Sequence, residues 1–135
     1  MTPEFLDNQQ YTELSILRYE AIYGHNYISP GGENTTDQFI DTLKLLPKMR
    51  VLDIGCGLGG PAYRMASKYG VYVHGIDLSA NMIRIAKTRL KEEGLNIWWH
   101  WYREIAWKYK RKRPLMWFTV VMFFYTSKTK HICLK

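Results

Sequence analysis

Three glycines and two aspartates near the middle of the chain could hold a nucleoside-type ligand. Gly55, Gly57 and Gly60 form a G-x-G-x-x-G pattern, and their missing side chains let the backbone turn tightly and approach a ligand. Asp77 follows about 20 positions later, the spacing at which a carboxylate binds the ribose hydroxyls of an adenosine. This pattern alone is only moderately specific.

Asp53 sharpens the interpretation because it lies two positions before the first glycine, a place that is usually apolar in nicotinamide-binding loops. A carboxylate beside the loop favours a cationic ligand over a pyrophosphate. S-adenosylmethionine carries an adenosine, a sulfonium and an ammonium group, and it fits this charge pattern. Two alternatives stay open: a nicotinamide or flavin site, and a glycine-rich turn without a ligand, in which Asp53 only caps a helix.

The elements that must position these residues follow from the apolar periodicity. Strands are predicted at residues 50–54 and 71–76, and a third begins at 95–97. Helices are predicted at 12–23, 35–46, 61–70 and 79–94; Thr35 with Gln38 forms a capping box, and Ser79 is placed to cap the last helix. Strands that alternate with helices indicate an α/β domain with a parallel sheet.

The composition divides the chain in two. It has 135 residues, 47% of them hydrophobic, which suffices for one globular domain. Residues 1–97 contain ten basic and eleven acidic residues, whereas residues 98–135 contain nine basic residues, one acidic residue and all five Trp. The longest apolar run, at 115–125, is too short to cross a bilayer.

Only two cysteines are present, Cys56 and Cys133, and neither has a neighbour at zinc-ligand spacing. We therefore expect no metal site and a reducing, cytoplasmic location. The first residues contain neither a basic stretch nor an apolar run, so no secretory signal is expected.

Several motifs together resemble the phosphoethanolamine N-methyltransferases, which are class I S-adenosylmethionine-dependent methyltransferases. The glycine loop with its strand, residues 51–60, is similar to motif I of that class. Four further blocks stand in the family's order at residues 5–12 (FLDNQQYT), 19–24 (YEAIYG), 26–32 (NYISPGG) and 74–79 (HGIDLS). The resemblance covers residues 5 to about 95 and implies a Rossmann-like class I methyltransferase sheet with N-terminal helices that form a lid.

The resemblance also implies the roles of particular residues. Tyr11 corresponds to the tyrosine that forms a lid and catalytic dyad with a downstream histidine, and Tyr19 corresponds to a substrate-binding tyrosine. The cofactor contacts carry over to Ile28, Ser29, Asp53, Gly55, Gly57, Asp77 and Leu78. The implied reaction is N-methylation of phosphoethanolamine or its methylated forms, in phosphocholine synthesis, by a monomer without a nucleic-acid partner. Without the resemblance, Tyr11 and Tyr19 read as a helix face packed on the core.

The family pattern stops after residue 97. We therefore divide the chain into an N-terminal helical lid region (1–47), the first half of an S-adenosylmethionine-binding domain (48–97), and an atypical basic and aromatic tail (98–135). Read one base earlier, the codons of residues 116–125 permit Asp-Val-Val-Tyr-Ser-Arg-Asp-Val-Phe-Leu, which resembles the family's next motif. We hypothesise that the tail is frame-shifted and the chain truncated, so that the dyad histidine and half of the sheet are missing and the edge of the second strand is uncovered.

Two rival functions remain open at this point. A non-catalytic cofactor-binding fragment or interaction protein is one, because the dyad partner is missing. A nucleic-acid or membrane-surface binder is the other, because residues 108–113 are strongly basic and Trp residues lie nearby. The aromatic run could also complete a strand of the sheet, although nothing in its pattern requires it.

Overall fold

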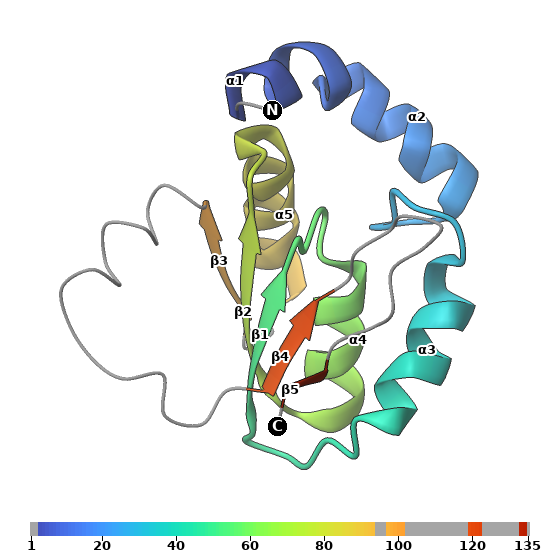
Figure 1. Cartoon of the computed structure of the whole chain (residues 1–135), viewed down its shortest axis with the longest axis vertical. Coiled ribbons are helices and arrows are strands. Elements are labelled where there is room, and N and C mark those ends of the chain that lie inside the picture. Colours follow the sequence, from blue (N-terminus) through green and yellow to red (C-terminus); the bar gives the residue numbers. More distant parts are fainter. Residues whose placement is uncertain (1–2, 94–96, 102–118, 123–132, 135) are drawn as a thin grey trace, which may run out of the picture.

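Two parallel strands, β1 (Arg50–Ile54) and β2 (Tyr72–Asp77), form the centre of a five-stranded sheet (Figure 1). The computed structural model describes residues 3–93, 97–101, 119–122 and 133–134. The strand order is β3-β2-β1-β4-β5, in which β3 (Ile97–Trp101) and β4 (Thr119–Met122) run parallel to their neighbours. The short strand β5 (Cys133–Leu134) is antiparallel to β4. The α/β class and the parallel sheet are as expected.

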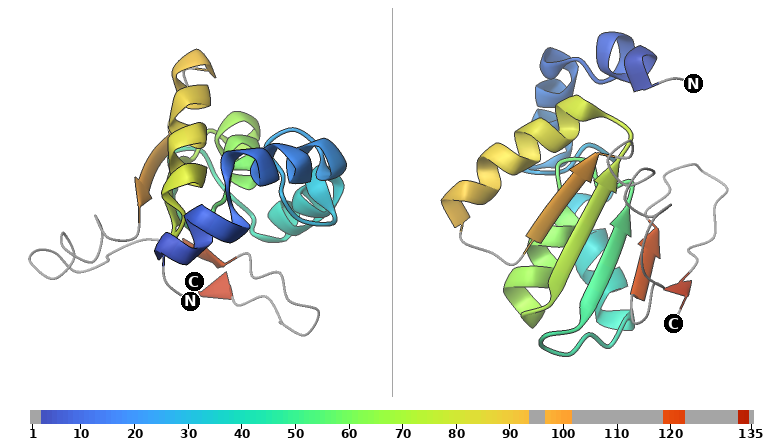
Figure 2. Two further views of the ribbon diagram at one scale, coloured as in Figure 1. Left: turned by 90° about the horizontal axis from the view of Figure 1, so that it is seen from above. Right: turned by 90° about the vertical axis from the view of Figure 1, so that its left-hand side faces the viewer.

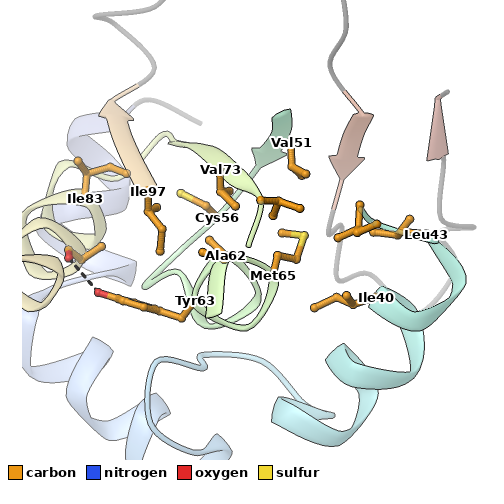
Figure 3. Packing of buried hydrophobic residues seen from close by; sticks show 14 residues of the cluster. Ile40, Leu43, Val51, Cys56, Ala62, Tyr63, Met65, Val73, Ile83 and Ile97 are labelled. Carbon is orange, nitrogen blue, oxygen red and sulfur yellow. Dashed lines mark hydrogen bonds between the residues drawn. The ribbon is translucent and has the colours of Figure 1, made fainter. Parts of the chain in front are cut away.

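Three helices cover one face of this sheet (Figure 2). They are α3 (Gly32–Thr42), α4 (Gly60–Tyr69) and α5 (Ala80–Glu93). Figure 3 shows that their apolar side chains and those of the strands form a single buried cluster. Ile40 of α3, Met65 of α4 and Ile83 of α5 meet Val51 and Val73 in it. Burial of this apolar surface is the main force that holds the helices on the sheet.

Local signals in the sequence set the bounds of most helices. The helix α2 (Glu13–Tyr23) begins after Thr12, whose Oγ1 accepts a hydrogen bond from the Ser15 amide, and it ends at Gly24. Pro61 lies in the first turn of α4, where no amide hydrogen is needed. The Oγ of Ser79 accepts a 3.2 Å hydrogen bond from the Met82 amide, so Ser79 caps α5 as predicted.

The capping box predicted at Thr35 and Gln38 is wrong. The helix α3 begins three residues earlier, after Gly31, and ends at Thr42 instead of reaching Leu46. Gly31 has a φ of +97°, and its carbonyl accepts the Thr35 amide, so the backbone itself closes the first turn. Lys44 has a φ of +52°, which stops the helix before Pro47.

The N-terminal helices lie across the carboxyl ends of the parallel strands (Figure 1). They are α1 (Pro3–Phe5), the π-helix η1 (Leu6–Gln10) and α2, and we call residues 3–23 the lid. The helix α3 was assigned from the sequence to the same region, but its Ile40 belongs to the core cluster of the sheet. Within the described helices, none combines the length and apolarity needed to cross a bilayer.

The edge of β2 is covered, contrary to our expectation. The strand β3 pairs with it from Val73–Ile97 to Asp77–Trp101, so the aromatic residues 98–101 form part of the sheet. On the other side, β4 pairs with β1. Most of residues 98–135 lies outside the described residues, including the basic stretch 108–113. The frame-shift hypothesis therefore stays a hypothesis.

Candidate cofactor site

A cavity of about 710 Å³ lies between the lid and the carboxyl ends of β1 and β2. Cofactor sites of open α/β sheets are found at this end of the strands. The walls come from the lid, the loop that follows α2, the glycine loop, and the loop between β2 and α5. The lining residues are Leu6, Gln10, Tyr11, Tyr19, Asn26, Tyr27, Ile28, Ser29, Pro30, Ile54, Gly55, Cys56, Gly57, Leu58, Pro61, Ile76, Asp77, Leu78 and Met82.

The glycine loop is tied to β2 and folds under the segment that follows α2. The amides of Gly55 and Cys56 donate to the Ile76 carbonyl at 2.8 and 3.1 Å. Gly55 and Gly57 have φ values of +79° and +54°, which residues other than glycine rarely adopt. A Cβ on Gly60 would lie 2.8 Å from the carbonyl oxygen of Asn26 and from the ring of Tyr27. The third glycine is therefore needed for close packing of two protein segments.

Asp77 holds the glycine loop and the start of α5 together. One carboxylate oxygen accepts the Gly57 amide at 2.8 Å, and the other accepts the Ser79 amide at 2.9 Å. Burial raises the pKa of this carboxyl, and the backbone hydrogen bonds from Ser79 and Gly57 oppose that effect. A carboxylate oxygen can accept more than one hydrogen bond, so Asp77 keeps acceptor capacity for a diol in the cavity.

Asp53 does not line the cavity. Its side chain is fully buried in β1, and neither carboxyl oxygen has a hydrogen-bond partner in the described part of the chain. It therefore does not cap a helix. Burial, together with the nearby negative charge of Asp77, raises the pKa of Asp53 to about 8, so the group is mostly protonated at neutral pH.

Tyr11 and Tyr19 both face the cavity from the lid side. Tyr11 also packs against a small buried cluster that contains Ile16, Leu58 and Met82, so the packing interpretation is partly right. Burial raises the pKa of Tyr11, and the charges of Asp77 and Tyr19 raise it further. The side chain is thus a neutral phenol at neutral pH. The side-chain amide of Gln10 donates a hydrogen bond to the phenol oxygen of Tyr11 at 3.3 Å.

The structure brings together most of the residues that the sequence singled out. Tyr11, Tyr19, Ile28, Ser29, Gly55, Gly57, Asp77 and Leu78 all line the cavity, and only Asp53 does not. Sequence reasoning missed the other lining residues, although most of them stand within the motifs quoted for the resemblance: Leu6, Gln10, Asn26, Tyr27, Pro30, Ile54, Cys56, Leu58, Pro61, Ile76 and Met82. In the described residues, no group of three or more His, Cys, Asp or Glu side chains could hold a metal ion.

Comparison with known proteins identifies the family. The model of the mycolic acid cyclopropane synthetase family matches residues 18–111, well over half of the chain. The chain belongs to this family. It is 55% identical over 85 residues to phosphoethanolamine N-methyltransferase 1 of Zea mays, a match that covers 63% of this chain and 17% of the relative.

Solved structures of a phosphoethanolamine N-methyltransferase are also similar to this chain. Phosphoethanolamine N-methyltransferase 2 of Haemonchus contortus, in complex with S-adenosyl-L-methionine, superposes with a TM-score of 0.70 at 42% identity, covering 73% of this chain and 24% of that one. The same enzyme with phosphomonomethylethanolamine and S-adenosylhomocysteine gives a TM-score of 0.69 at 42% identity, over 72% and 23% of the two chains. The resemblance to phosphoethanolamine N-methyltransferases and the incomplete class I methyltransferase fold are confirmed. The chain spans less than a quarter of the length of these two enzymes.

Proposed function

We propose that this chain is the lid and first half of the cofactor domain of an S-adenosylmethionine-dependent phosphoethanolamine N-methyltransferase. The observation that carries the proposal is one cavity that gathers the glycine loop, Asp77 and two lid tyrosines. The chain is also similar to the phosphoethanolamine N-methyltransferases of Zea mays, over 85 residues, and of Haemonchus contortus, over 73% of its length. Phosphoethanolamine or its methylated forms are the proposed substrates. The cytoplasm and a monomeric state, both expected from the sequence, remain part of the proposal.

The lining residues fit S-adenosylmethionine, which supplies an electrophilic methyl group when it is bound. The partly buried carboxylate of Asp77 would accept hydrogen bonds from the ribose hydroxyls, since its backbone contacts already fix its orientation. Leu78, which is 44% exposed, would lie along the adenine. Gly55 and Gly57 would admit the cofactor next to the backbone, and Ile28 and Ser29 would contact it from the opposite wall.

The lid tyrosines would handle the amine of the substrate. An ammonium group has no lone pair for attack on a methyl group, so it must lose a proton at the site. A neutral phenol such as Tyr11 would accept a hydrogen bond from the ammonium and orient its nitrogen, and its raised pKa makes it a poor final acceptor of the proton. In the complete enzyme, the proton would pass to the histidine that the resemblance implies as the dyad partner of Tyr11. Tyr19 would bind the substrate beside it.

One observation favours the rival proposal of a non-catalytic cofactor-binding fragment. Among the described residues that line the cavity, none is a histidine, so the dyad partner implied by the resemblance is not placed beside Tyr11 there. In that case the chain would bind the cofactor without transferring a methyl group. The two proposals share the cofactor site and differ only in the chemistry that follows.

The first test is calorimetric titration of S-adenosylhomocysteine into the purified chain. We expect saturable binding, and binding at least about tenfold weaker in Asp77→Asn, which loses a charged acceptor for the ribose. The matched control is Asp41→Asn, which removes an exposed carboxylate of α3 that pairs with Lys68 on the surface. Absence of binding by a folded wild-type chain contradicts the proposal. Transfer of labelled methyl to phosphoethanolamine then separates the enzyme from the non-catalytic fragment.

A further inference from the structure

A carboxylate of the lid is bonded to the first turn of a helix more than 70 residues away. Asp7 lies in η1, and its Oδ1 accepts hydrogen bonds from the Ser79 hydroxyl at 2.5 Å and the Asn81 amide at 3.2 Å. Its Oδ2 accepts the Ala80 amide at 3.1 Å. These donors are the cap residue and the first two residues of α5.

This contact suits the chemistry of both partners. An ionised carboxylate only accepts hydrogen bonds, and the first amides of a helix lack acceptors within the helix. The positive end of the helix dipole also favours a negative charge at this position. Asp7 therefore completes the N-terminus of α5 together with Ser79, whose Oγ accepts the Met82 amide while its hydroxyl donates to Asp7.

Asn81 extends the contact to the lid residue that faces the cavity. Its side-chain amide donates to the backbone carbonyl of Asp7 at 3.1 Å and to that of Tyr11 at 2.9 Å. The backbone of Tyr11 is therefore fixed to α5 directly. The lid segment between Asp7 and Tyr11 is held at both of its ends.

The cap residue of α5 is also bonded to Asp77, which holds the glycine loop. The Ser79 amide donates to Asp77 Oδ1, and Asp77 Oδ2 accepts the Gly57 amide. Hydrogen bonds thus run without a break from the lid through Asp7 and Ser79 to Asp77 and the glycine loop. A ligand that orders Asp77 acts on the segment to which the lid is attached.

We propose that Asp7 is a positioning residue that couples lid docking over the cavity to occupation of the Asp77 site. This inference rests on the proposed function for the identity of the ligand. Docking through Asp7, together with the Asn81 bonds, sets where Tyr11 lies, and a ligand bound at Asp77 strengthens the docking. By linkage, the docked lid strengthens ligand binding by the same factor.

Other contacts between the lid and α5 make the Asp7 contact separable from folding. Arg89 binds Glu20 near the end of α2, and the side chains of this ion pair are largely buried. Arg89 also donates to the side chain of Asn26, which follows α2. Arg84 binds Glu13 at 2.9 Å, and both side chains are more than half exposed. Loss of the Asp7 carboxylate therefore removes three of the bonds that hold the first part of the lid, and it leaves the Asn81 bonds and the attachment of α2 in place.

Hydrogen–deuterium exchange of the full chain tests the coupling. The variants are Asp7→Ala, Asp7→Asn and the matched control Glu13→Gln, with and without S-adenosylhomocysteine at a concentration that saturates each variant in calorimetry. We expect the ligand to slow exchange in peptides from residues 3–16 of the wild type by at least about fivefold, the order that one charge-assisted hydrogen bond contributes. In Asp7→Ala this slowing is lost and the ligand binds several-fold more weakly.

The remaining arms separate positioning from a purely structural role. Asp7→Asn keeps one acceptor oxygen and is expected to restore part of the slowing, and Glu13→Gln is expected to match the wild type. If Asp7→Ala exchanges faster but the ligand slows it by the wild-type factor, Asp7 is a structural tether only and the coupling is refuted. Unchanged exchange in Asp7→Ala also refutes it.

Two further outcomes are decisive. Should Asp7→Ala fail to fold, Asn81→Ala takes its place, because it removes only the two side-chain bonds to the carbonyls of Asp7 and Tyr11. If the folded wild type does not bind S-adenosylhomocysteine, the proposed function fails and the coupling fails with it. If it binds the ligand but the lid exchange does not respond, the coupling alone fails.

Discussion

At the scale of single residues, Asp53 is fully buried, and its carboxyl group has no hydrogen-bond partner in the described part of the chain. Burial and the neighbouring Asp77 raise its pKa from 3.8 to about 8. Between these two values the folded chain holds a proton that the unfolded chain has released. The unfolding free energy therefore falls as pH rises through this window, by on the order of 1 kcal/mol per pH unit, and the fall ends near pH 8.

The variant Asp53→Asn isolates this effect because its amide is of similar size and does not titrate. We expect the stability of the wild type, measured relative to Asp53→Asn by urea unfolding, to decline steadily from pH 5 to pH 8. The control is Asp37→Asn: a hydrogen bond from Arg64 lowers the pKa of Asp37, so its contribution changes only in more acidic solution. Parallel pH profiles for the wild type and Asp53→Asn would contradict the assignment.

At the scale of elements, two ion pairs join α2 to α5 with different burial. Arg89 binds both carboxylate oxygens of Glu20 at 2.6 and 2.8 Å, and the two side chains are 20% and 12% exposed. Burial alone would raise the pKa of Glu20, but hydrogen bonds from Arg89 and from the Asn26 amide outweigh it and lower the pKa. Arg84 and Glu13 are 54% and 61% exposed.

We therefore expect Arg89→Met to destabilise the chain by about 2 kcal/mol at pH 7, because it strands a largely buried carboxylate. The same change at Arg84 should cost less than about 1 kcal/mol, since exposed pairs contribute little. Urea unfolding measures both. The cost at Arg89 should shrink as pH falls, because a carboxyl with a lowered pKa loses its contribution in acid. Equal costs for the two variants would show that burial does not distinguish the pairs.

The elements that the sequence predicted well are those with local signals. Thr12, Pro61 and Ser79 act on amides within their own first turns, so α2, α4 and α5 could be placed to within a residue or two. The start of α3 could not, because Thr35 offers a competent cap while Gly31 uses its backbone instead.

Contacts between distant segments leave no local trace. The role of Asp7 was invisible in the sequence because its partners are 72 to 74 positions away. The charge of Asp53 predicts a position beside the ligand. In the structure Asp53 instead lies two positions after Val51 in β1, on the same buried face of the sheet. Eight other site residues were found because they belong to motifs quoted for the resemblance.

At the scale of the whole chain, charge and cavity belong to different parts of the sequence. The described residues that line the cavity fall within residues 1–97, which carry a net charge of −1, whereas residues 98–135 carry +8. S-adenosylhomocysteine has no net charge at neutral pH. Its binding should therefore respond little to salt, whereas any association of the basic segment with nucleic acid should be of the non-specific, salt-sensitive kind.

Parallel titrations in one set of buffers test this separation. Between 50 and 200 mM NaCl we expect the affinity for S-adenosylhomocysteine to change less than about twofold, and the affinity for a labelled DNA duplex, followed by anisotropy, to fall at least about 100-fold. Replacing Lys110 and Arg111 by Glu should weaken binding of the DNA duplex and leave the affinity for S-adenosylhomocysteine unchanged. Duplex binding that survives 200 mM salt, or that S-adenosylhomocysteine displaces, would favour a nucleic-acid-binding protein over the proposed methyltransferase, because charge alone produces neither behaviour.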